Sequence, residues 1–173
     1  MATVLFDGEL DVHYGFGFLH GSDDEAPDLD EARDGQTNGL LGVAVPGGLS
    51  LMFGLHTGPE PLRVEWSESA PPVDDIWEEV VEGSVEFETT ELLLAAFEEF
   101  IELQLPVPGS HRVRFNARGM DAARDLDSRD ESEAAPDRYL LQLWPAPATP
   151  EAVIKQTSQV ADYWHQVARG EAD

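Results

Sequence analysis

The residue types most able to do chemistry in this sequence are arginines placed at alternate positions. Arg112, Arg114 and Arg118 fall on one side of an extended segment, and six of the ten basic residues lie between residues 112 and 138. A guanidinium group offers rigid, bidentate donors that suit carboxylates and phosphates. The pattern therefore indicates a site that binds an anion, a ligand or an acidic group of a partner.

A structural role is the competing interpretation of these arginines. Outward carboxylates on a neighbouring strand, such as Glu86 and Glu88, could pair with them across the sheet. We favour this pairing for Arg112 and Arg114, and leave the role of Arg118 open.

Carboxylates gather in a second stretch, residues 21–38, which is too polar and too charged to pack as a core element. We expect a mobile acidic surface loop here. A calcium-binding loop of the EF-hand type needs glycine at its sixth position, but counting from Asp23 or Asp28 places Asp28 or Arg33 there. A solvated loop and a partner-binding loop both remain open. The candidate partner-binding residues are Asp23, Asp24, Glu25, Asp28, Asp30 and Glu31.

Patterns typical of enzymes are absent from the sequence. The chain has no cysteine, its five histidines lack the spacing of a metal site, and it contains neither a G-x-S-x-G elbow nor a phosphate-binding loop. Ser110 and His111 are adjacent, so their side chains diverge in an extended chain. We therefore expect a protein without catalytic residues, metal or cofactor.

The charge balance is strongly acidic. Thirty-five acidic against ten basic residues leave a net charge of −25, which disfavours binding to nucleic-acid phosphates. Evenly spread, this charge would favour solubility alone, whereas clustering would make it a recognition feature. A GC-rich genome or a high-salt cytoplasm is the alternative explanation. No signal peptide and no run of about 18 apolar residues is visible, so we expect a cytoplasmic protein without a membrane span.

Period-2 alternation dominates the elements that would position these residues. His111–Gly119 and Arg138–Trp144 are predicted to pair as antiparallel strands across a second mobile acidic loop, residues 119–137. Further strands are expected at Glu9–Leu19 and within 76–89, and 91–105 is ambiguous but favours strands. The predicted fold is a mainly β, antiparallel β-sandwich that spans residues 1–173 as a single domain. The other strand predictions are 40–45 and 49–55, which flank a Pro-Gly-Gly hairpin turn, and 62–66.

The C-terminal region has helical periodicity. Apolar residues recur at helical spacing, Thr149 can cap the element, Pro150 suits its first turn and Gly170 can close it. The sequence predicts an α-helix over 148–170 that packs on the sheet.

The order of these segments resembles that of a known family. An early Leu-Asp-Val-His-Tyr strand is followed by Glu-Gly-Ser-Val-Glu-Phe-Glu (82–88), Leu-Pro-Val-Pro-Gly-Ser-His-Arg-Val-Arg-Phe (105–115) and Tyr-Leu-Leu-Gln-Leu-Trp-Pro-Ala-Pro (139–147). In this it resembles the competence protein J family, inhibitors of a DNA-entry nuclease in competent bacilli, and related small acidic actinobacterial proteins. The resemblance implies a compact β-sandwich that acts by binding, with the acidic residues of 23–31 offered to a cleft that normally holds phosphates.

Two functions follow as expectations. The first is a non-catalytic acidic interaction protein of inhibitor or immunity type, whose partner is a basic protein such as a nuclease or toxin. The second is a small-molecule-binding or enzymatic β-sandwich with an aromatic pocket near Arg118. The residues expected to line that pocket are Tyr14, Phe16, Trp66 and Trp144.

Overall fold

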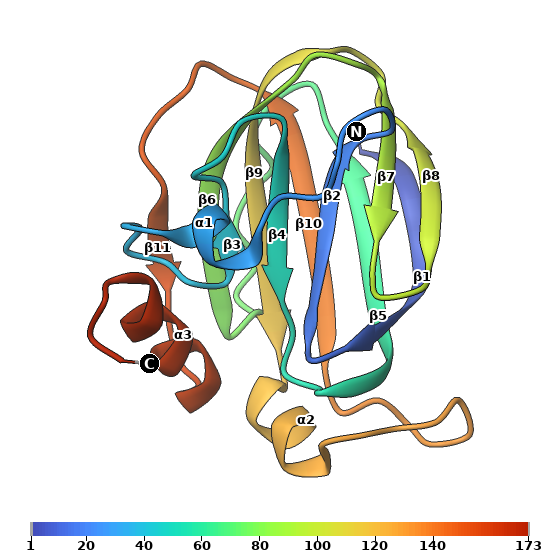
Figure 1. Cartoon of the computed structure of the whole chain (residues 1–173), viewed down its shortest axis with the longest axis vertical. Helices are drawn as coiled ribbons and strands as arrows, with labels where there is room; N and C mark the ends of the chain where they lie inside the picture. Colours follow the sequence, from blue (N-terminus) through green and yellow to red (C-terminus); the bar gives the residue numbers. More distant parts are fainter. Residues whose placement is uncertain (1, 173) are drawn as a thin grey trace.

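A computed structural model describes residues 2–172, and these residues form a curled β-sheet with three short helices (Figure 1). Strand accounts for 44% of the chain and helix for 13%, so the mainly β class is confirmed. The strands are β1 (Thr3–His13), β2 (Phe16–Gly21), β3 (Leu41–Gly42), β4 (Gly48–Met52), β5 (Thr57–Trp66), β6 (Glu79–Phe87), β7 (Glu91–Ala95), β8 (Phe100–Gln104), β9 (Gly109–Arg118), β10 (Arg138–Pro145) and β11 (Ala152–Lys155). The helices are α1 (Leu29–Arg33), α2 (Met120–Leu126) and α3 (Gln159–Ala168).

The central strand pair is the one predicted from alternation. β9 and β10 pair antiparallel, with Arg118 opposite Arg138 at one end and His111 opposite Pro145 at the other. The apolar side chains of β9, such as Val113 and Phe115, are fully buried because they face the interior. The predicted pairing of these two segments is therefore confirmed along its whole length.

The sheet is continuous, which corrects the expected antiparallel sandwich. Its strand order is β11-β6-β9-β10-β5-β1-β2-β4-β3, with β7 paired to β2 and β8 to β7, and the β10–β5 pair is parallel. The sheet curls into a half-barrel, in which β2, β3, β4, β7 and β8 form a front wall and β11, β6, β9, β10, β5 and β1 form a back wall (Figure 1). Leucines of the front wall and apolar residues of the back wall share one core between the walls.

The change from back wall to front wall occurs at a tight turn, which makes the prediction of one strand over Glu9–Leu19 wrong. Tyr14 and Gly15 have φ of 63° and 71° and form a two-residue turn, so His13 pairs with Phe16. Leu10 and Val12 before the turn face the core. Phe16 and Phe18 after it point to the outside, because β2 buries its other face.

Other predicted strands are confirmed. β3 and β4 form the hairpin around Pro46-Gly47-Gly48, and the ambiguous segment 91–105 is the β7–β8 hairpin. In β6, Val85 and Phe87 are buried as expected, while Glu86 and, directly after the strand, Glu88 are exposed.

The C-terminal helix is shorter than predicted. Only Gln159–Ala168 is helical, and the residues expected to form its first turns instead form β11, which pairs with β6. The cap is Ser158, whose Oγ accepts a hydrogen bond from the N–H of Ala161 at 3.1 Å. The carboxylate of Glu79 accepts hydrogen bonds from the N–H groups of Thr157 and Ser158, at 2.7 Å and 3.0 Å, and fixes this start.

The sequence predicts loops at both acidic segments, but each of them contains a short helix. Residues 21–38 contain α1, which is capped by Asp28 and buries Ala32 and Arg33 against the sheet. Residues 119–137 contain α2. Among residues 2–172, no helix is long and apolar enough to cross a membrane.

Candidate interaction surface

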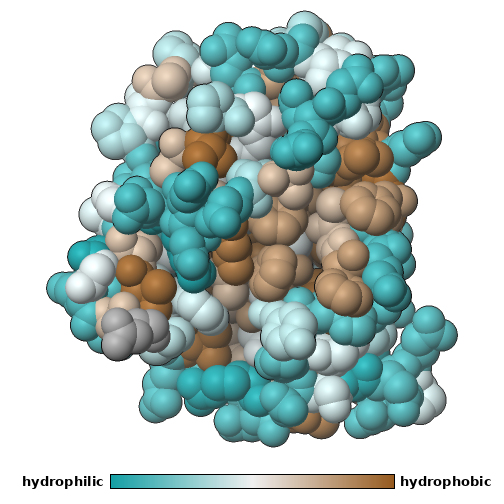
Figure 2. Space-filling model, in the orientation of Figure 1, coloured by the Kyte–Doolittle hydropathy of each residue, from teal (hydrophilic) through white to brown (hydrophobic). Residues whose placement is uncertain are grey.

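The outer side of the front wall carries an unusual concentration of apolar side chains. We call Phe16, Phe18, Leu93, Phe97 and Phe100 the aromatic face. On this side Phe18 lies opposite Ala95, and Ala95 lies opposite Phe100. Phe97 and Phe100 are 60% and 64% exposed, so this end of the face is open to solvent. Figure 2 shows apolar colour over β2, β7 and β8, bordered by hydrophilic residues.

The outer side of the back wall follows the ordinary pattern of a one-sided antiparallel sheet. Its β1 positions are Asp7, Glu9 and Asp11, all exposed, and Arg63 of β5 pairs with Asp7 at 3.0 Å. The outward apolar residues of the front wall are therefore a local departure from that pattern and not a property of the whole sheet.

The segments that form and connect the front-wall strands carry negative charge with almost no compensating base. Residues 16–55 contain seven acidic residues and one base, and residues 88–104 contain five acidic residues and no base, a net charge of −11. The single base, Arg33, is 6% exposed. These segments thus differ from the rest of the chain in their lack of bases, whereas their density of acidic residues, 12 in 57, is close to that of the whole chain, 35 in 173.

Residues 21–38, which we call the acidic segment, are held against the front wall by the helix α1. Asp28 Oδ1 accepts hydrogen bonds from the N–H groups of Asp30 and Glu31, at 3.0 Å and 3.1 Å. Arg33 pairs with Asp30 at 3.0 Å and places its guanidinium carbon 4.6 Å from the centre of the Trp164 ring. Two of the six predicted partner-binding carboxylates therefore stabilise α1.

The other four predicted carboxylates are turned to solvent. They accept no hydrogen bond from any residue between 2 and 172, and the segment that carries them turns back after Gly21, whose carbonyl accepts from the N–H of Asp24 at 3.0 Å. These four are Asp23, Asp24, Glu25 and Glu31, and all are exposed.

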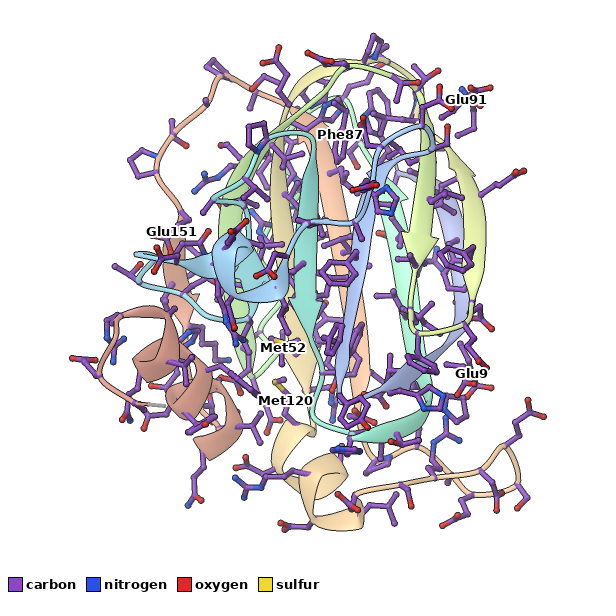
Figure 3. All side chains as sticks on the ribbon, viewed as in Figure 1. Glu9, Met52, Phe87, Glu91, Met120 and Glu151 are labelled. Carbon is purple, nitrogen blue, oxygen red and sulfur yellow. The ribbon has the colours of Figure 1, made fainter. Side chains whose placement is uncertain are left out.

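The far end of the segment is fixed by Glu151. Its carboxylate accepts hydrogen bonds from the N–H groups of Thr37 at 3.0 Å and Asn38 at 2.7 Å (Figure 3). Burial alone would raise the pKa of Glu151, but these hydrogen bonds outweigh it and lower the pKa. The carboxylate of Glu151 thus fixes the C-terminal end of the acidic segment next to β11.

The three predicted anion-binding arginines do not form one site. Arg112 and Arg114 share the carboxylate of Glu82, at 3.1 Å and 2.9 Å, so they pair across strands, although with a different glutamate from those expected. Arg118 is exposed at the other end of β9, opposite Arg138.

The prediction of an aromatic pocket near Arg118 is wrong. Trp66 donates its ring N–H to Nε2 of His111 at 3.1 Å, and Trp144 lies under the guanidinium of Arg114 at 5.0 Å. β5 runs from Thr57, opposite His13, to Trp66, opposite Thr3, so the tryptophans lie at the end of the sheet far from Tyr14. Tyr14 instead lines a cavity of about 410 Å³ with residues 52–56, Arg124, Asp127, Val160, Tyr163 and Trp164.

A buried acidic cluster is a chemical feature that the sequence did not reveal. Glu60 and Asp137 are both 0% exposed, and the Tyr139 hydroxyl donates to Asp137 Oδ2 at 2.5 Å. Burial, followed by the nearby Asp137, raises the pKa of Glu60 to about 10. Because solvent cannot reach either carboxyl group, the cluster serves the interior and not a substrate.

Comparison with known proteins supports the fold and does not extend to the sequence. No family model and no curated protein sequence matches the chain. Among solved structures, ComJ from Bacillus subtilis, an inhibitor of the DNA degrading activity of NucA, aligns over 84% of this chain and 99% of its own, with a TM-score of 0.59. The fold is similar to that of ComJ. At 16% identity, the ComJ similarity defines architecture alone.

A second solved structure has the same architecture as ComJ. The product of crocagin biosynthetic gene J aligns over 85% of this chain and 99% of its own, with a TM-score of 0.57 and 14% identity. The structural resemblance to ComJ expected from the order of segments is therefore confirmed.

Sequence reasoning missed the aromatic face because it placed Phe16 and Phe18 on the side of Leu10 and Val12. The available signal was Gly15, whose φ of 71° is the left-handed conformation that glycine favours in a two-residue hairpin turn. Placing the turn there reverses the side to which the later aromatic residues point.

Proposed function

We propose that the chain is a non-catalytic binding protein of inhibitor type, whose partner is a basic protein such as a DNA-degrading nuclease. The observation that carries this proposal is the front wall of a ComJ-like fold, which combines a net charge of −11 with a single, buried base. The description of ComJ as a nuclease inhibitor supports the same class of activity.

Electrostatics makes a nuclease a suitable partner. A nuclease cleft attracts phosphates through basic residues, and a clustered field of carboxylates is attracted by the same charges. The unpaired carboxylates of the acidic segment are exposed: Glu31 lies on α1, which Arg33 anchors, and Asp23, Asp24 and Glu25 lie just before this helix. They are our proposed first contact with the partner.

Three of the arginines suit a structural role better than a binding role. Arg112 and Arg114 are neutralised by Glu82, and Arg129 pairs with Glu9 at 2.6 Å. Side chains committed to such pairs cannot release counterions from nucleic acid, so DNA itself is a poor ligand for this chain.

Calorimetric titration tests the proposal. We expect NucA, or a nuclease encoded beside the gene for this chain, to bind tightly at low ionic strength and more weakly as salt is added. The reason is that the Debye screening length falls to about 8 Å at physiological salt. If every basic nuclease tested binds more weakly than millimolar at low salt, the proposal fails.

Small-molecule binding is a second candidate, favoured by the cavity of about 410 Å³ beside Tyr14. Its aromatic and aliphatic lining suits an apolar ligand. A ligand that co-purifies with the chain and is lost in Val160→Trp, which fills the cavity, would support this function in place of the first.

A further inference from the structure

We infer that the partner docks on the aromatic face, with the acidic segment and the β7–β8 hairpin as its charged rim, and that the docking surface of the partner pairs exposed apolar residues with arginine or lysine. This inference rests on the proposed function and specifies where and how the partner binds. The acidic segment alone would leave the apolar side chains beside it without a role.

Solvent exposure of the aromatic face requires an explanation. Single exposed apolar residues are ordinary, but a contiguous group marks an interaction site. Phe16 and Phe18 contact each other with ring centroids 5.5 Å apart, and Phe97 contacts His13 with centroids 4.7 Å apart. With Phe18 opposite Ala95, and Ala95 opposite Phe100, these contacts connect β2 to the edge strand β8.

The arrangement matches the anatomy of a protein interface. Such interfaces place aromatic residues at a core that excludes water and charged residues at the rim. Here Glu102 lies opposite Leu93 on the outer side of the β7–β8 pair, and Glu91 and Glu98 are exposed on the same hairpin. At the opposite edge of β2, which pairs with β4, the helix α1 packs over β4 and exposes Asp30 and Glu31.

Charge complementarity selects a basic occupant over a second copy of this chain. A symmetric dimer through the aromatic face would bring two acidic rims together, each with the same uncompensated carboxylates. Like charges across an interface oppose association. A basic surface would gain from the same rim, and its arginines could stack on the exposed rings of Phe97 and Phe100.

A pair of double variants with a matched control separates apolar docking from general charge attraction. The first double variant is Phe97→Asp with Phe100→Asp; both side chains are more than half exposed, so we expect the fold to be retained. The control is Ile76→Asp, a substitution at another exposed apolar residue, 54% exposed, in the segment between β5 and β6. Each variant adds negative charge, which alone would strengthen attraction to a basic partner.

Two probes are titrated into each variant, namely the nuclease NucA and a synthetic octapeptide of alternating arginine and leucine. We expect the double Asp variant to bind both probes at least tenfold more weakly than the native chain, and Ile76→Asp to bind within twofold of it. Phe97→Ser with Phe100→Ser, which adds no charge, should weaken binding in the same direction. Thermal unfolding checks that each variant is folded.

The outcomes separate this inference from the proposed function. If the peptide shows the expected loss but no nuclease binds, the docking surface stands and the nuclease proposal fails. If the nuclease binds all variants equally, the proposed function stands and the inference is overturned. It is also overturned if the native chain forms dimers at micromolar concentration that the double Asp variant abolishes, since a second copy would then occupy the face.

Discussion

The hydroxyl group of Tyr139 donates a hydrogen bond to Oδ2 of Asp137 at 2.5 Å, in the interior of the sheet. The same hydroxyl accepts from the N–H of Gly54 at 2.8 Å. Within residues 2–172, both carboxyl oxygens of Glu60 and Oδ1 of Asp137 lack any such partner. A proton retained on Glu60 resolves this shortage, because a neutral carboxyl group can donate to the neighbouring carboxylate and need not be solvated.

The raised pKa of Glu60 makes the free energy of unfolding depend on pH. The folded chain holds a proton on Glu60 up to a pKa of about 10, whereas the unfolded chain loses it near the ordinary pKa of 4.5. Between these values the folded state binds more protons, so stability is greatest below the lower pKa and falls as pH rises. We expect chemical denaturation to show this decline from pH 7 to pH 9.5, with a slope of up to about 1.4 kcal/mol per pH unit.

Glu60→Gln is the variant that identifies the source of this decline. The amide cannot ionise and can still donate to Asp137, so the slope above pH 7 should largely disappear. Burial lowers the pKa of His111 and, to about 4, that of His165, so both histidines contribute stability that rises with pH only up to their unfolded pKa near 6.5. The measurement is therefore made above pH 7. An unchanged slope in Glu60→Gln would show that Glu60 is not the titrating group.

Removal of the carboxylate that Arg112 and Arg114 share should destabilise the chain strongly. Glu82→Gln leaves two guanidinium groups, 11% and 6% exposed, without a counter-charge. Breaking such a buried pair costs about 3 kcal/mol or more. The control Glu86→Gln changes an exposed residue and should alter the free energy of unfolding by less than about 0.5 kcal/mol. Equal effects in urea denaturation would argue against the observed pairing.

Arg118 and Arg138 lie opposite each other in the β9–β10 pair, and both are exposed. Like charges at directly opposed positions are destabilising, so Arg118→Glu should raise the free energy of unfolding by about 0.5 kcal/mol. Arg63→Glu is the contrasting variant, since it breaks the pairs with Asp7 and Glu65 and should lower stability. A loss of stability in Arg118→Glu would mean that this arginine has a favourable partner.

The position of α1 should depend on the ring of Trp164. Without that ring, Arg33 loses its stacking contact and keeps only the exposed carboxylate of Asp30. In Trp164→Leu we expect faster amide hydrogen exchange at residues 29–33 than in the native chain, with little change in β9. If amide hydrogen exchange at residues 29–33 is as fast in the native chain as in Trp164→Leu, the acidic segment is a mobile loop, as the sequence predicts.

The sequence was most informative where side-chain alternation continued through a whole strand. Arg112, Arg114 and Asn116 alternate with Val113, Phe115 and Ala117 over the length of β9, and the β9–β10 pairing was predictable for that reason. The β7–β8 hairpin was harder, because its Leu, Ala and Glu content favours helix. Pairing with β2 overrides that local preference.

The misplaced elements have local physical causes. The Tyr14-Gly15 turn lacks the usual Asn or Asp before glycine, and a two-residue turn preserves the period of 2 while reversing the side that is buried. Val153 and Ile154 fit helical spacing, but they belong to a short strand that pairs with the edge of β6. The acidic cluster at Glu60 depends on residues 137 and 139, which only the folded chain brings together.

The most direct test of the central claim is degradation of linear DNA by NucA, or by the nuclease encoded beside this gene, in the presence of the chain at low ionic strength. We predict that inhibition rises with the concentration of the chain, is complete near equimolar amounts, and is relieved by added salt. Degradation that continues at an unchanged rate in the presence of a tenfold excess of the folded chain would contradict the account.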